Sequence, residues 1–113
     1  MNISTRTVGA VTVVDIDGNL KLGEDTEQFR THIRGLLDSG ARKILLNMRN
    51  IHHLDSSGVG ELVRAFASTN SQGGELKLVN LTKRLHDLLS VTKLLTVFET
   101  FENEMRAVDS FGK

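Results

Sequence analysis

The chain has 113 residues, with 14 basic and 14 acidic side chains and a formal net charge of zero. This balance, the scatter of its Lys and Arg residues and the lack of Trp and Tyr argue against nucleic acid as a partner. Cysteine is also absent, which excludes disulfides, thiolate metal sites and cysteine nucleophiles.

The length predicts one domain, spanning residues 1–113, that can bury a single hydrophobic core. The sequence contains no apolar run near 18 residues and no basic-plus-apolar signal at its N-terminus. We therefore expect a cytoplasmic protein without a membrane partner.

The first third of the chain predicts two strands, a loop and a helix. Residues 3–8 and 11–16 are short β-branched runs separated by a Gly, as in adjacent strands joined by a tight turn. Residues 19–24 predict a loop whose two leucines cover the edge of the core. Asp25 and Gln28 resemble a capping box, and apolar residues at helical spacing follow them.

The rest of the chain alternates strands and helices. Residues 44–48 form an apolar run typical of a central strand, and residues 75–81 and 94–99 predict two more strands. Thr82 is a suitable cap for a short helix between those two. A terminal helix is expected to dock through Phe101, Met105 and Val108. The resulting order, strand-strand-helix-strand-helix-strand-helix-strand-helix, is typical of an α/β domain.

The segment between the predicted central strand and the next helix is unusual in composition. Ser56 and Ser57 fall where the helix begins, and serine is a preferred helix cap. Gly58 and Gly60 follow in the first helical turn, where glycine is unfavourable. The glycines either clear space around the hydroxyls for the backbone of another molecule, or allow the helix to pack tightly against the strand.

Catalytic chemistry fits this segment poorly. Ser56, His52 or His53, and Asp55 include the residue types of a hydrolase, but side chains this close across a tight turn do not align as nucleophile, base and orienting group. Adjacent histidines on an extended chain point to opposite sides, which disfavours a zinc site. The glycine spacing at residues 58–60 is not that of a phosphate-binding loop. We expect no catalytic residue, metal or cofactor.

A surface hydroxyl can instead serve as a modification site. A phosphoryl group adds about −1.5 to −2 charges, which the N-terminus of a helix tolerates. In an interface the same group would be desolvated and repelled by acidic side chains opposite. A penalty of ~4 kcal/mol would weaken binding about a thousandfold.

One segment carries a family resemblance. Asp55-Ser56-Ser57-Gly58-Val59-Gly60, preceded by Ile44-Leu45-Leu46-Asn47 and followed by Gly73-Gly74-Glu75-Leu76-Lys77-Leu78, resembles bacterial anti-sigma-factor antagonists, the STAS domains. The likeness covers nearly the whole chain. It implies an α/β fold, with a small mixed sheet of about five strands flanked by about four helices.

The resemblance also implies a partner-switching function without enzymatic activity. In this family the unphosphorylated protein binds an anti-sigma factor that is also a serine kinase, which frees the sigma factor. The kinase phosphorylates the serine directly after the Asp, here Ser56, and Ser57 is the second choice. A metal-dependent serine phosphatase reverses the reaction. Asp55 is implied to shape or contact the site.

The expected partner surface begins at this segment and continues along the helix. Glu61, Arg64 and Ser68 are predicted to be exposed because they lie off the apolar helix face. The full set of expected contact residues is Asp55, Ser56, Ser57, Gly58, Gly60, Glu61 and Arg64.

Two points stay open. The segment Lys21-Leu22-Gly23-Glu24 departs from the family, in which an acidic residue often follows the preceding leucine, so the identity of the partner is undetermined. An alternative function is that of a STAS subunit in a larger assembly, such as a stress-sensing or lipid-transport complex, that docks without a phosphoswitch.

Overall fold

The computed structural model describes residues 1–112 and contains a five-stranded sheet in the order β1-β2-β3-β4-β5. The strands are β1 (Asn2–Val8), β2 (Val11–Leu20), β3 (Lys43–Leu54), β4 (Glu75–Val79) and β5 (Thr100–Phe101). The helices are α1 (Glu24–Asp38), α2 (Ser56–Ser71), α3 (Lys83–Val91) and α4 (Glu104–Ser110). Only β1 and β2 are antiparallel; the other neighbours are parallel. The predicted element order and mixed sheet are confirmed, and Lys113 lies outside the described residues.

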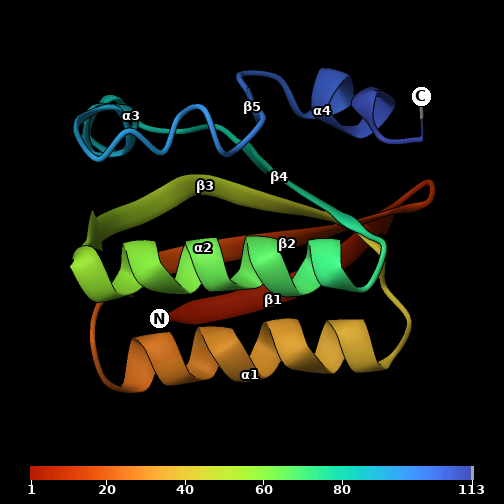
Figure 1. Ribbon diagram of the computed structural model, residues 1–113, viewed down its shortest axis with the longest axis horizontal. Helices are drawn as coiled ribbons and strands as arrows, with labels where there is room; N and C mark the ends of the chain where they lie inside the picture. The colour runs from red at the N-terminus through yellow and green to blue at the C-terminus, as the bar shows by residue number, and fades with distance from the viewer. Residues whose placement is uncertain (113) are drawn as a thin grey trace.

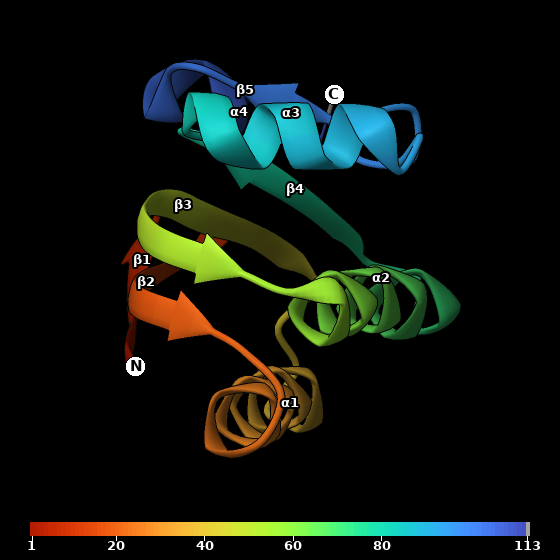
Figure 2. The ribbon, with the colours of Figure 1, turned by 90° about the vertical axis from the view of Figure 1, so that its left-hand side faces the viewer.

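The sheet has helices on both faces. Helices α1 and α2 cover one face, and α4 packs against the other, as Figures 1 and 2 show. The first half of central strand β3 is therefore buried on both sides, and Ile44, Leu45 and Leu46 have no exposed surface. Such a continuous apolar run is what parallel strands between two helical layers require. None of the helices within residues 1–112 combines the length and apolar character needed to cross a lipid bilayer.

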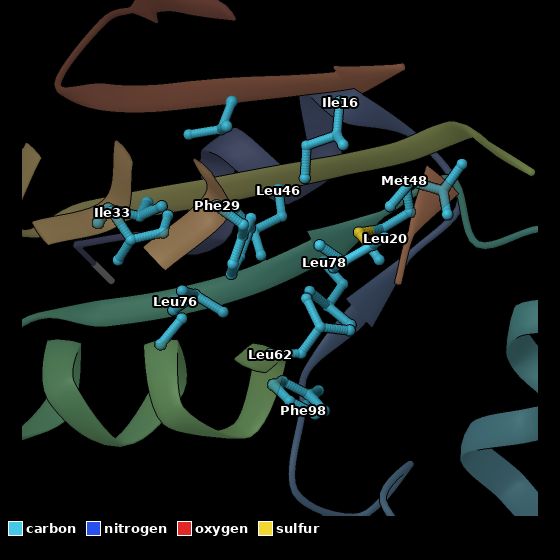
Figure 3. Close-up of a cluster of buried hydrophobic side chains, with 14 of the residues drawn as sticks. Ile16, Leu20, Phe29, Ile33, Leu46, Met48, Leu62, Leu76, Leu78 and Phe98 are labelled. Carbon is cyan, nitrogen blue, oxygen red and sulfur yellow. The ribbon is translucent and has the colours of Figure 1, made fainter. Parts of the chain in front are cut away.

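Two apolar clusters hold the layers together. The larger joins β2, β3 and β4 to α1, α2 and α3 (Figure 3). Its labelled members in that view are Ile16, Leu20, Phe29, Ile33, Leu46, Met48, Leu62, Leu76, Leu78 and Phe98. The smaller cluster lies under α4 and consists of Val11, Val13, Leu45, Val79, Ala107 and Phe111.

Strands β2 and β3 extend beyond their predicted ends. Leu20 pairs with Leu54 and Asn19 with His53, so the last residues of the two parallel strands lie side by side. The segments that follow them, residues 21–23 and 55–57, therefore leave the sheet at the same edge (Figure 2). This placement brings the start of α2 and the loop after β2 together on one surface.

The last predicted strand is wrong in position. Residues 94–99 form irregular turns, and the strand that completes the sheet is the two-residue β5. Phe98 is buried in the main cluster from these turns, which explains why its segment has an apolar pattern without being a strand. Met105, predicted to face the core, is 74% exposed, and Ala107 and Phe111 anchor α4 instead.

The predicted capping box of α1 is also wrong. The N-cap is Gly23, whose φ of 114° is accessible mainly to glycine. Thr26 Oγ1 accepts a hydrogen bond from the Gly23 N–H at 3.1 Å. Asp25 Oδ2 accepts one from the Lys21 N–H at 3.3 Å, and Gln28 is exposed.

Candidate functional site

Ser56 is the first residue of α2, and its side chain is exposed. Ser57 is half-buried. Strand β3 fixes the start of this helix at the edge of the sheet, beside the end of β2. The hydroxyl of Ser56 is therefore open to an approaching protein, which is the condition that any enzymatic modification of it requires.

The helix cap is Asp55, and not either serine as the residue types had predicted. Asp55 Oδ1 accepts a hydrogen bond from the Gly58 N–H at 2.8 Å, and Oδ2 accepts one from the Leu22 N–H at 3.0 Å. A carboxylate has two oxygens, so it can cap α2 and hold the neighbouring loop at the same time. Within residues 1–112 neither serine side chain makes a hydrogen bond. The Ser56 hydroxyl therefore does not cap the helix and is free to react.

The Asp55 carboxyl has a lowered pKa. The causes, in order of size, are the hydrogen bonds from the backbone N–H groups of Leu22 and Gly58, and the positive charge of Lys21 contributes less. Asp55 therefore stays ionised at neutral pH, and a fixed negative charge lies next to Ser56. A phosphate on Ser56 would add to that charge.

The lowered pKa predicts a pH-dependent stability. Because the folded pKa of Asp55 lies below its unfolded value, its contribution is complete above the unfolded pKa of about 3.9 and is lost as the pH falls through the folded pKa. Urea denaturation between pH 7 and pH 2 should show a smaller acid-induced loss of unfolding free energy in Asp55→Asn than in the wild type. Identical pH profiles for the two proteins would contradict the assigned hydrogen bonds.

The two glycines of the segment have different roles. A Cβ atom on Gly58 would overlap the carbonyl oxygen of Leu20 and lie 2.6 Å from Cδ1 of Leu54. Gly58 is buried and allows α2 to pack against the ends of β2 and β3. Gly60 is exposed, and a Cβ atom there would have no neighbour within 4 Å. Tight packing therefore explains Gly58, and an open surface surrounds Gly60.

Glu61 is buried, contrary to the prediction that it is exposed. It is 5% exposed, because α1 packs beside α2 and Arg30 reaches across to it. Arg30 Nε donates to Oε1 at 3.2 Å, and Arg64 Nη1 donates to Oε2 at 3.3 Å. The hydrogen bond from Arg30 is also the main cause of the lowered pKa of Glu61. Arg64 is exposed and Ser68 half-buried, so the outer surface here is formed by arginines and not by the carboxylate.

Leu22 was not predicted from the sequence to be part of the exposed site. Of the two leucines predicted to cover the core, Leu20 is buried, whereas Leu22 is 76% exposed. Its N–H donates to Asp55, so this exposed residue is held next to the residue that precedes Ser56. The atypical composition of the loop is the signal in the sequence that could have identified it.

The two adjacent histidines lie on the exposed end of β3. His52 Nε2 is 3.9 Å from Asp17 Oδ1, and His53 Nδ1 is 3.4 Å from Arg84 Nη1. Among the described residues neither ring is hydrogen-bonded to Ser56, so the segment has no hydrogen-bonded pair of nucleophile and base. Residues 1–112 also contain no group of three or more His, Cys, Asp and Glu side chains suited to a metal ion.

Two curated relatives are similar to this chain in sequence. An anti-sigma F factor antagonist of Paenibacillus polymyxa is 29% identical over 65 residues, covering 58% of this chain and 56% of that protein. An anti-sigma-B factor antagonist of Bacillus subtilis is 34% identical over 71 residues, covering 63% of this chain and 64% of that protein. The chain thus spans less than two thirds of the length of either relative.

Solved structures share the fold. A candidate anti-sigma factor antagonist of Thermotoga maritima superposes with a TM-score of 0.91 at 22% identity, covering 98% of this chain and 95% of that one. The Bacillus cell fate determinant SpoIIAA in its phosphorylated form superposes with a TM-score of 0.74 at 23% identity, covering 96% and 97%. Residues 2–107 match the model of the STAS domain. The chain therefore belongs to the STAS domain family.

Proposed function

We propose that this chain is an anti-sigma-factor antagonist that is switched by phosphorylation at Ser56. In its unphosphorylated form it binds an anti-sigma factor with serine kinase activity and thereby frees a sigma factor. The kinase then phosphorylates Ser56, the complex dissociates, and a serine phosphatase restores the binding form. The proposal places the protein in the cytoplasm, where sigma factors and ATP are found.

The observation that carries this proposal is the exposed, unbonded hydroxyl of Ser56 at the start of α2. Two kinds of comparison support it. Both sequence relatives are named anti-sigma factor antagonists, and one structural neighbour was solved in a phosphorylated form.

The local electrostatics explain how a phosphate could act on a partner without unfolding the protein. The first turn of α2 contains no acidic side chain, and the end of a helix that presents N–H groups favours an anion. The Gly58 N–H is already bound to Asp55, so a phosphate on Ser56 would remain directed toward solvent. The added charge therefore bears mainly on whatever protein covers Ser56.

Phosphorylation with the kinase-type anti-sigma factor from the same genome and ATP tests the proposal. Mass spectrometry should find one phosphate, on Ser56. Ser56→Ala should remain unmodified, whereas Ser57→Ala, the matched control, should still be phosphorylated at Ser56. A phosphate found on Ser57 alone would contradict the proposal, because the switch would then be Ser57 and not Ser56.

Binding without any phosphorylation would overturn the switch and favour the docking-module alternative. The exposed Leu22 beside Ser56 gives that alternative a physical basis, since an apolar side chain can anchor a permanent interface. In that case Leu22→Ala would weaken assembly while Ser56→Ala would leave it unchanged.

A further inference from the structure

A groove lies between α1 and α2, which run side by side in Figure 1. It encloses a cavity of about 160 Å³. The apolar part of its lining consists of Phe29, Ile33, Leu37 and Ala65. Ligand pockets for drug-sized molecules measure about 300–1,000 Å³, whereas a cavity of about 150 Å³ accommodates a molecule the size of benzene. The groove therefore fits one apolar side chain, and not a cofactor.

The charged residues around this groove are unbalanced. Three arginines, Arg30, Arg34 and Arg64, line it together with two acids, Glu61 and Asp38, which leaves one excess positive charge. Glu61 is shared between two of the arginines. Arg34 is exposed and has no ion-pair partner within residues 1–112. A guanidinium in this state is available to a carboxylate of another molecule.

The groove lies beside the same helix that begins at Ser56. Both lie on α2, and Arg64 follows Ser56 by about 12 Å along the helix axis at 1.5 Å per residue. A standard protein interface buries about 800 Å² on each partner, which is wide enough to cover both. The helix thus presents a modifiable hydroxyl at one end and a basic, apolar-lined groove beside its middle.

We propose that the groove binds an acidic segment of the anti-sigma factor. One apolar side chain of that segment enters between α1 and α2, and its carboxylates contact Arg34 and the exposed edge of Arg64. This inference rests on the proposed function and specifies the chemistry of the partner. Since about 12 Å exceeds the Debye length of about 8–10 Å, a phosphate on Ser56 acts mainly on the part of the partner that covers Ser56, and the groove supplies affinity that both forms share.

Charge reversal at Arg34 tests the groove. Arg34→Glu should weaken binding of the kinase-type anti-sigma factor, measured by isothermal titration calorimetry, by at least about tenfold, because like charges would then face each other. Arg106→Glu is the matched control. It makes the same charge change at an exposed position of α4, on the face of the sheet opposite to α1 and α2, and should bind within about twofold of the wild type. Arg34→Gln removes the charge without reversing it and should weaken binding less than Arg34→Glu. It serves as the test variant if Arg34→Glu does not fold.

A second variant tests the apolar part of the groove. Ser68→Leu would place a side chain in the cavity and should also weaken binding by about tenfold, since the partner's side chain would be excluded. Circular dichroism and thermal melting would establish that each variant is folded.

The possible results separate this inference from the proposed function. Suppose the folded Arg34 and Ser68 variants bind with wild-type affinity while Ser56→Asp loses binding. That result would contradict binding in the groove but would leave the proposed phosphoswitch intact. Failure of the wild-type chain itself to bind the anti-sigma factor would overturn both.

Discussion

Ser56→Asp should lose at least about a hundredfold in affinity for the anti-sigma factor while keeping the thermal stability of the wild-type protein. The new carboxylate would be directed toward solvent beside Asp55, so binding would desolvate two adjacent negative charges. The fold should tolerate the change, because an acidic residue in the first turn of a helix is favourable by about 0.3–1 kcal/mol. Calorimetric titration and differential scanning calorimetry measure the two effects separately.

Two further variants make this comparison specific. Ser56→Ala should bind the anti-sigma factor constitutively, even in the presence of kinase and ATP. Thr7→Asp introduces the same charge at an exposed position on edge strand β1, opposite Thr12, and should leave the affinity unchanged. A folded Ser56→Asp protein with wild-type affinity would mean that no partner covers Ser56, and collapse of its fold would mean that the serine is structural.

Gly58→Ala should destabilise the protein by about 1–3 kcal/mol, the range expected when a methyl group is forced into a packed region. The added carbon would overlap the backbone oxygen of Leu20. Because Leu20 is paired with Leu54 in the sheet, its backbone cannot move like the end of a side chain. Helix α2 would have to shift away from the ends of β2 and β3. Urea denaturation followed by circular dichroism gives the free energy of unfolding.

Gly60→Ala is the matched control, two residues further along the same helix. Space is open around it, so the better helix propensity of alanine should stabilise the protein by about 0.5–1 kcal/mol. The two substitutions are chemically identical, but their effects on the free energy of unfolding should have opposite signs. Equal effects would show that α2 does not pack on β2 as described.

The order of strands and helices could be predicted because each depends on a local pattern. The residue run at 44–48 is buried on both faces as its continuous apolar character indicated. Residues 94–99 misled the prediction, since their apolar side chains pack into the core from turns, and a short apolar run does not specify its backbone conformation. Strand β5 has two residues, too few to leave a pattern.

The details of the site depend on contacts between distant segments, and the sequence alone does not contain them. Asp55 caps α2 because the loop after β2 supplies a second donor from Leu22. Glu61 is buried because Arg30, on another helix, neutralises its charge. Helical spacing correctly separates polar from apolar positions on α2, but it cannot show which polar position a neighbouring helix will cover.

The affinity of one preparation of the protein for its anti-sigma factor, measured before and after stoichiometric phosphorylation, tests the central claim most directly. Loss of about a thousandfold in affinity on modification of Ser56, reversed by a serine phosphatase, is the predicted result. Equal affinity of the two forms would contradict the claim that a charge at the start of α2 determines which partner is bound.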